Sequence, residues 1–164
     1  MRIAVVFGRF QPMHNGHYSA FARIAKKCGR LLIFIGSSQY KRTHDNPLSG
    51  MERKRMLSHA LPPEAAKKAS IYLLRDEHDN EKWTAKVSLA LGKRRGVTVF
   101  TNNSLVRRLL RPHYAVAPME SGIKLNSTRV RKEIRRGGYW KELVPRGVSE
   151  FLHRARLIEV IASI

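Results

Sequence analysis

The chain begins with two short apolar segments separated by an interval long enough for one helix. Residues 3–7 (IAVVF) end at Gly8, and residues 31–35 (LLIFI) end at Gly36. Continuous apolar runs of this length are typical of parallel strands that are buried on both faces. Apolar residues recur at helical spacing in the interval between them, at Phe21, Ile24 and Ala25. Strand, helix and strand in this order predict a parallel sheet with right-handed crossovers.

The same alternation continues in looser form along the rest of the chain. We expect further strands at Ser70–Leu74, Val97–Thr101 and Tyr114–Ala117, and helices at 49–60, 80–91, 103–110, 126–136 and, as a tail, about 147–162. The sequence therefore predicts an α/β fold, a Rossmann-like doubly wound parallel sheet of about five strands with a C-terminal helical segment. We expect residues 1–164 to form a single domain, on which a helical tail of about 139–164 is docked.

Length and composition narrow the class of protein. With 164 residues, 43% of them hydrophobic, the chain suits one compact domain that buries about two-thirds of its unfolded surface. No run approaches the roughly 18 consecutive apolar residues of a membrane helix, and the start turns polar too early for a signal peptide. Cys28 is the only cysteine, so neither an internal disulfide nor a cysteine-based metal site is expected. These features favour the cytoplasm and no contact with a membrane.

The charge balance is strongly positive, with 32 Lys+Arg against 12 Asp+Glu and a formal net charge of +20. Such a chain attracts polyanions, and both nucleotides and nucleic acids qualify. The basic clusters at residues 92–96 and 129–136 are of a kind that usually forms solvated faces. Charge alone therefore predicts a nonspecific affinity for nucleic acid without deciding the function. We also expect a homo-oligomer.

The loop after the first strand carries two histidines, in GRFQPMHNGH (residues 8–17). Open parallel sheets bind phosphates at this position, where a helix N-terminus presents backbone N–H groups and a positive dipole. His14 and His17 flank the expected helix start, so their imidazoles and the Arg9 guanidinium would donate to one anion. Capping or packing is the alternative for each histidine. Zinc ligation is less favoured, because the spacing is three and no third ligand is evident, and we expect no protein metal ligand.

This decapeptide resembles the first signature of the HxGH nucleotidyltransferase superfamily. The form GRFQPxHxGH is that of its archaeal-type nicotinamide mononucleotide adenylyltransferases, and the ten residues stand in the expected context. The resemblance implies that the loop binds ATP through Gly8, Arg9, Phe10, His14, Gly16 and His17. It also implies that Arg9 and the two histidines contact the phosphates.

A second segment, LNSTRVR (residues 125–131), is similar to the superfamily's ISSTxxR motif, with departures at its first two residues. Hydroxyls at a helix start can cap the helix or bind phosphate oxygens, and an arginine one turn inside can reach the same anion. Alone, the segment is typical of a Ser/Thr cap before a basic surface helix. Beside the first signature, the resemblance implies that Ser127, Thr128 and Arg131 complete the triphosphate site. The turn TNNSL (residues 101–105) resembles the family's (S/T)GNxLV, with Asn102 in place of glycine, which implies that these residues, Asn102 among them, lie beside the adenosine.

Two segments after the second strand resemble the acceptor side of the archaeal-type enzymes. GSSQ (residues 36–39) is similar to their GSxQ, which implies that Ser37 and Gln39 lie beside the acceptor, although an ordinary strand-to-loop turn has the same composition. NPLSGMER (residues 46–53) resembles their NPFxxxER. From the residues alone, Glu52 and Arg53 are no more than a surface pair.

One residue between these segments departs from the family. The family usually has a basic residue just before its Asn/Asp-Pro, where it helps to hold the acceptor's phosphate, whereas this chain has Asp45. A carboxylate repels phosphate. Lys41, Arg42 or His44 of the same loop can substitute, and we assign Arg42 to acceptor binding.

Asp76, Asn80 and Trp83 match the spacing of the family's DxxxNxxW stretch, which lies against the nicotinamide ring. An indole can stack on a flat cationic pyridinium, and a nearby amide or carboxylate can bind the carboxamide. A tryptophan on an amphipathic helix more often belongs to the core. With the upstream motifs, the resemblance implies that these three residues bind the acceptor.

The resemblance covers nearly the whole chain and implies a nicotinamide-nucleotide adenylyltransferase, which converts ATP and nicotinamide mononucleotide to NAD and pyrophosphate. The acceptor's phosphate needs no general base, so in-line attack requires placement and fixed donors, which His14, His17, Arg9 and Arg131 supply. Mg²⁺ bound mainly through the ATP phosphates is the expected cofactor. The alternatives are a phosphopantetheine adenylyltransferase, a CTP-dependent cytidylyltransferase, or a basic nucleic-acid-binding protein on the same fold. The choice between amidated and acidic mononucleotide stays open.

Overall fold

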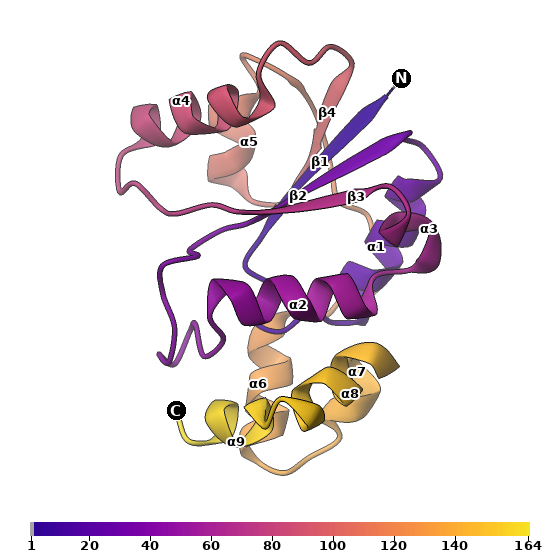
Figure 1. The fold of residues 1–164 in the computed structure, drawn as a ribbon, viewed down its shortest axis with the longest axis vertical. Coiled ribbons are helices and arrows are strands. Elements are labelled where there is room, and N and C mark those ends of the chain that lie inside the picture. Colours follow the sequence, from indigo (N-terminus) through magenta and orange to yellow (C-terminus); the bar gives the residue numbers. More distant parts are fainter. Residues whose placement is uncertain (1) are drawn as a thin grey trace.

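The computed structural model describes residues 2–164 and is built around a five-stranded parallel sheet (Figure 1). The strands are β1 (Ile3–Gly8), β2 (Arg30–Ile35), β3 (Ala69–Leu73), β4 (Val97–Phe100) and β5 (Ala115–Ala117). Their order across the sheet is β3-β2-β1-β4-β5, so the winding direction reverses between β1 and β4. This order is that of the doubly wound Rossmann-like fold, and the predicted fold class is confirmed.

Both faces of the sheet are covered by helices, which explains why residues 3–7 of β1 and 31–35 of β2 are all apolar. Ala4 and Val6 of β1 pack in a cluster with α1 (Asn15–Ala25), α2 (Gly50–Ala60) and α3 (Pro63–Ala66). Ile3 and Val5 point the other way, into a cluster with α4 (Asn80–Leu91) and α5 (Ser104–Leu110). The register of β1 with β2 and with β4 aligns the carboxyl ends of the central strands at one edge.

The C-terminal helices lie together beyond this edge, at the bottom of Figure 1. They are α6 (Ser127–Arg135), α7 (Trp140–Leu143), α8 (Arg146–Arg154) and α9 (Leu157–Ala162). Helix α8 packs against α2 and α9 packs against α6. Their buried side chains join the cluster that contains α1 and α2, namely Val148, Leu152, Leu157 and Ile161. We infer from this shared core that the tail and the sheet form one domain.

Three local features differ from the sequence-based prediction. The helices α3 and α7 have four residues each, too few for a helical period to show in the sequence. The tail, predicted as one helix from about 147 to 162, is interrupted at Arg156, whose φ of 52° is left-handed. The apolar spacing widens to five between Leu152 and Leu157, where the interruption lies. Within residues 2–164, none of the helices combines the length and apolarity needed to cross a membrane.

Candidate active site

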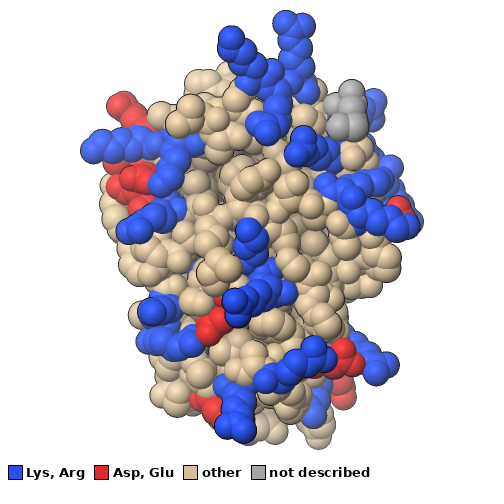
Figure 2. Space-filling model, in the orientation of Figure 1, with Lys and Arg blue, Asp and Glu red and all other residues tan. Residues whose placement is uncertain are grey.

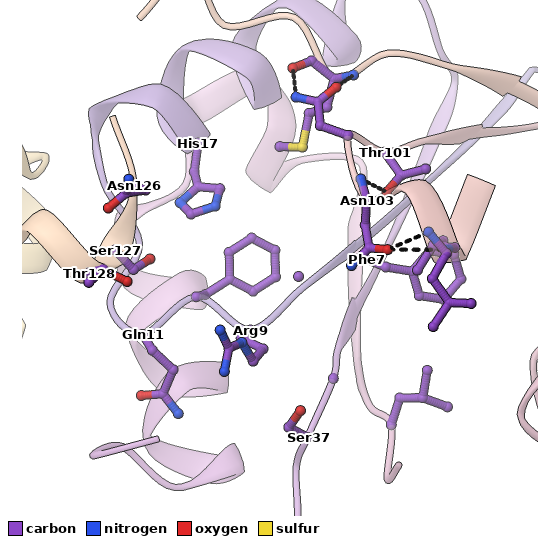
Figure 3. Close-up of a pocket in the computed structure, with 18 of the residues that line it drawn as sticks. Phe7, Arg9, Gln11, His17, Ser37, Thr101, Asn103, Asn126, Ser127 and Thr128 are labelled. Atoms are coloured by element: carbon purple, nitrogen blue, oxygen red, sulfur yellow. Dashed lines mark hydrogen bonds between the residues drawn. The ribbon is translucent and has the colours of Figure 1, made fainter. Parts of the chain in front are cut away.

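A cleft of about 890 Å³ opens at the carboxyl ends of β1 and β4, where the sheet changes its winding direction. Crevices at this position bind ligands in open α/β sheets, because the loops on either side of it diverge. The loop after β1, the turn after β4 and the first residues of α1 and α6 line it. Figure 3 shows His17 on the same side as Asn126, Ser127 and Thr128, with Thr101 and Asn103 opposite and Arg9 between.

The two histidines cap α1 reciprocally. His14 is the N-cap residue, and its Nδ1 accepts the backbone N–H of His17 at 3.4 Å. The Nδ1 of His17 accepts the backbone N–H of His14 at 3.3 Å. Because each Nδ1 is an acceptor, the ring proton of each histidine lies on Nε2. Capping therefore does not exclude anion binding, since each ring keeps one N–H to donate.

Burial keeps both rings neutral. It lowers the pKa of His14 to about 4, and burial together with the neighbouring His14 lowers the pKa of His17 well below its usual value. The ring centroids are 3.7 Å apart, so two charged imidazoles would repel each other strongly. Gly16 leaves room for this arrangement, because a Cβ there would lie 3.0 Å from the His14 ring. Near pH 7 the pair consists of uncharged donors.

The loop residues before the histidines support the rings. The Phe10 backbone is left-handed, with φ of 52°, and its buried side chain lies edge-on to His17 with ring centroids 5.0 Å apart. A Cβ on Gly8 would come within 2.6 Å of the Phe10 ring, which explains the glycine. The Arg9 side chain is exposed and lines the cleft.

On the α6 side, the cap is Asn126, whose side chain accepts the backbone N–H of Arg129 at 2.9 Å. Asn126, at which this segment departs from the family's motif, is therefore the residue that caps α6. The sequence alone had suggested a Ser or Thr hydroxyl for this role. The Ser127 hydroxyl donates to the Pro12 carbonyl at 2.9 Å, and Thr128 lines the cleft. Arg131, only 1% exposed, also lines it. The start of α6 therefore adds a hydroxyl and a buried guanidinium to the lining of the cleft.

At the turn after β4, the Asn102 side chain is bound to the backbone of Met119. Its amide donates to the Met119 carbonyl at 2.9 Å and its oxygen accepts the Met119 N–H at 3.0 Å. Asn103 caps α5 through the backbone N–H groups of Leu105 and Val106. Asn102 lines the cleft, but both ends of its amide are engaged in holding the turn.

The remaining wall of the cleft comes from the ends of β2 and β3 and the start of α4. Ser37, Asp76, Asn80 and Trp83 line it. The Asp76 Oδ1 accepts the backbone N–H of Ser37 at 3.1 Å, which leaves its second carboxylate oxygen for a ligand. Trp83 is half-buried, and the centroids of its indole and of the Phe7 ring are 5.5 Å apart. Both sequence-based alternatives for Trp83, packing and ligand contact, are compatible with this position.

Gln39 and Arg42 are not among the residues that line the cleft. The Gln39 side chain binds the Asp76 backbone twice, donating at 3.2 Å and accepting at 3.1 Å, so it holds the loop that carries Asp76. Arg42 pairs with Glu52 at 2.6 Å and donates to the Pro47 carbonyl at 2.8 Å. The hydrogen bond from Arg42 lowers the pKa of Glu52 to about 2, so this pair is fully charged near neutral pH.

Sequence reasoning missed the role of Arg53, and its assignment to a surface pair with Glu52 was wrong. Arg53 is 0% exposed, and its guanidinium donates to the carbonyls of Arg9, Gly36 and Ser37 at 2.8, 2.8 and 3.0 Å. It thus joins the loop after β1 to the loop after β2. Burial and then the charge of Arg9 lower the pKa of Arg53 to about 10. The signal was its helical spacing with the buried Met56, Leu57 and Ala60.

Other residues that line the cleft were not predicted, among them Lys124 and Ile123. The carboxylates that line it, Asp76, Glu77 and Asp79, all come from the loop between β3 and α4. Within residues 2–164, no group of three or more His, Cys, Asp or Glu side chains is placed to hold a metal ion.

The chain is similar to known proteins both in sequence and in fold. The cytidylyltransferase-like family model matches residues 5–133. The nicotinamide-nucleotide adenylyltransferase of Thermococcus onnurineus is 38% identical over 159 residues, which cover 94% of this chain and 83% of the relative. That of Thermoplasma volcanium is 36% identical over 152 residues, which cover 91% and 84%. The chain belongs to the cytidylyltransferase-like family, in its nicotinamide-nucleotide adenylyltransferase branch.

The fold of this family also appears among solved structures. A bifunctional NMN adenylyltransferase/ADP ribose pyrophosphatase from Francisella tularensis, solved with AMP and a manganese ion, superposes with a TM-score of 0.80 at 19% identity. The match covers 99% of this chain and 52% of that chain, so this chain spans about half of the bifunctional protein. At this identity the likeness shows the shared Rossmann-like fold.

Proposed function

We propose that this protein is a nicotinamide-nucleotide adenylyltransferase, which transfers the adenylyl group of ATP to nicotinamide mononucleotide and releases pyrophosphate. The observation that carries the proposal is the histidine pair, His14 and His17, two neutral imidazoles with fixed Nε2–H groups at the start of α1. A pair of this kind beside a helix N-terminus suits a polyanion whose charge grows during reaction. The names of the relatives support the choice of reaction.

The ATP phosphates would lie between α1 and α6. His14 and His17 donate from the start of α1, and Thr128 and Arg131 donate from α6, with the exposed Arg9 beside them. Because these donors are held before the nucleotide arrives, they stabilise the charge that develops on the phosphoryl oxygens and on the leaving pyrophosphate without reorganising. Gly8, Phe10 and Gly16 would shape the loop around the nucleotide, Ser127 would add a hydroxyl, and Asn102 would fix the turn beside the adenosine.

The acceptor would occupy the wall formed by Ser37, Asp76, Asn80 and Trp83. The indole of Trp83 stacks on the pyridinium ring, and the free oxygen of Asp76 and the amide of Asn80 bind the carboxamide. Gln39 acts through Asp76. Arg42 would have to exchange Glu52 for the acceptor's phosphate. That phosphate is an anion near neutral pH, so its oxygen attacks the α-phosphorus in line and the protein's task is placement.

A divalent cation fits this site through the substrate. The residues of the proposed phosphate site are donors, whereas the carboxylates of the cleft lie on the β3–α4 loop. Mg²⁺ would therefore be held by the ATP phosphate oxygens and water, where it would offset part of their negative charge.

The excess of basic residues supports a nonspecific affinity for nucleic acid. Figure 2 shows Lys and Arg side chains spread over the visible face with few Asp or Glu between them. Arg107 and Arg108 of α5 and Arg111 just after it line a second hollow of about 550 Å³, and none of them forms an ion pair within residues 2–164. Such a surface would bind a phosphate backbone in a salt-dependent way.

Two further properties belong to this proposal. We place the protein in the cytoplasm, because Cys28 is a buried free thiol that suits a reducing compartment. We also propose a homo-oligomer. Sedimentation velocity would measure the assembly state.

An end-point assay tests the reaction. The protein is incubated with ATP, Mg²⁺ and one acceptor at a time: nicotinamide mononucleotide, nicotinate mononucleotide or phosphopantetheine. CTP replaces ATP in a parallel series with a phosphoalcohol. Dinucleotide and equimolar pyrophosphate with a pyridine mononucleotide are expected. Product with phosphopantetheine alone, or with CTP alone, would overturn the assignment, and the two mononucleotides compared at equal concentration would give the acceptor preference.

A further inference from the structure

The loop of residues 41–47 lies between α2 and α6 and is fastened on both sides. On the α2 side, Arg42 of the loop pairs with Glu52. On the α6 side, two arginines one helical turn apart hold consecutive loop residues. Arg135 donates to the His44 carbonyl at 3.0 Å, and Arg131 donates to the Asp45 carboxylate at 3.2 Å. The carboxylate that departs from the family pattern thus contacts an arginine of the proposed triphosphate site.

Arg131 is a buried cation in positive surroundings. Its guanidinium donates one further hydrogen bond, to the Gln11 carbonyl at 3.1 Å, and its Nε–H has no acceptor within residues 2–164. Among residues 2–164, the charges that act on the Arg131 guanidinium are those of Asp45, Arg135 and Arg9, and of these Asp45 alone is an anion. A buried guanidinium without an anion is strongly unfavourable. Asp45 therefore stabilises Arg131 in this position before any nucleotide binds.

The contact with Asp45 uses only one of the hydrogen-bond donors of the Arg131 guanidinium. A guanidinium has five N–H groups, and the Asp45 and Gln11 contacts engage NH2 and NH1 once each. The Nε–H is buried and has no partner within residues 2–164, and Arg131 lines the cleft, so a phosphate would approach the guanidinium from the cleft side. Asp45 itself is largely exposed and is absent from the cleft lining. A bound triphosphate therefore need not displace it.

We propose that Asp45 is a positioning residue that holds Arg131 for the ATP phosphates. The proposal rests on the adenylyltransferase function proposed above and deepens it. Asp45 stands where the family pattern that this sequence resembles has a basic residue, and here the carboxylate serves the other substrate through Arg131. The ATP side is therefore the one that depends on Asp45.

Steady-state kinetics of Asp45→Ala distinguish a carboxylate that orients Arg131 from one that competes with phosphate for it. If Asp45 orients Arg131, the KM for ATP rises about tenfold, the scale of one charge-assisted hydrogen bond, while the KM for nicotinamide mononucleotide changes less than twofold. Asp45→Asn, which keeps an acceptor oxygen, falls between. If Asp45 instead competes with phosphate for Arg131, the KM for ATP falls, and that result overturns the proposal. An equal rise in both KM values overturns it as well.

Two further variants exclude a general loosening of the loop. Arg135→Ala removes the neighbouring contact to His44 but leaves the Asp45–Arg131 pair, so the KM for ATP should stay within twofold of the wild type. In an Arg131→Ala background, Asp45→Ala should add no further change. An additive effect there would mean that Asp45 acts without Arg131. Thermal unfolding followed by circular dichroism checks that each variant folds.

Direct titration of the protein with Mg·ATP keeps this inference separate from the proposed reaction. If the wild type binds ATP but makes no dinucleotide, the proposed function fails. The Kd for ATP of Asp45→Ala still tests the positioning role in that case: about tenfold weaker binding supports it, and unchanged or tighter binding refutes it.

Discussion

The two ends of the cleft differ in how their side chains are held. At the phosphate end (Arg9, His14, His17, Thr128, Arg131), both histidines are fixed by backbone hydrogen bonds and Arg131 is buried between a carbonyl and a carboxylate. At the acceptor end (Ser37, Asp76, Asn80, Trp83), Asn80 is exposed and Trp83 is half-buried. Preorganised donors suit the charge-bearing step, whereas exposed side chains can adjust to different acceptors. In the proposed function, the chemistry therefore depends on one end of the cleft and the choice of acceptor on the other.

The largest expected effect tests the phosphate end. His17→Ala should lower kcat by a hundredfold or more, the scale of one lost preorganised donor, and leave the KM for the acceptor nearly unchanged. Loss of the cap to His14 should also destabilise the fold by about 1 kcal/mol. Steady-state rates and urea unfolding measure the two effects. Alanine in place of the exposed His113 is the matched control, and full activity of His17→Ala would remove the imidazole from the mechanism.

An intermediate effect concerns pH and stability. The pKa of His14 is about 4 in the folded protein and about 6.5 when unfolded. As the pH falls from 6.5 towards 4, His14 becomes protonated in the unfolded chain but stays neutral in the folded protein. The free energy of unfolding therefore decreases, by about 3 kcal/mol for His14.

Urea unfolding across this range measures the slope, and His14→Asn, which can still cap α1, should flatten it. If the free energy of unfolding of His14→Asn depends on pH as steeply as that of the wild type, burial of the His14 ring is not the cause of the pH dependence. The phosphate end of the cleft would then be less rigidly preorganised than the contrast with the acceptor end implies.

The smallest expected effect lies at the acceptor end. Trp83→Ala should raise the KM for nicotinamide mononucleotide about tenfold, the loss of one aromatic contact, with the KM for ATP within twofold of the wild type. Trp83→Phe is the matched control, because it keeps a ring against Phe7 and should recover most of the affinity. If both KM values rise together, Trp83 is a packing residue and the two ends are not independent.

The sequence also predicted the two ends of the cleft unequally well. The strands and the loop of residues 8–17 were predictable, because long apolar runs and a helix start bearing two histidines are local patterns. The reciprocal cap that fixes their tautomers was not, since it depends on ring geometry. Where acceptor-side residues lie was harder to foresee. Gln39 and Arg42 are a few residues from Ser37 in the chain, yet the fold turns them towards Asp76 and Glu52.

Arg53 has a consequence for redesign of this protein. Its guanidinium is bound to main-chain oxygens of segments 9 and 36–37, so any insertion or backbone shift there would strand a charge in the interior. Sequence changes that alter the accepted substrate should therefore be tolerated in the β3–α4 loop, which Arg53 does not bind. A library that varies residues 77–82 and keeps 36–53 constant would be expected to yield far more folded variants than the reverse.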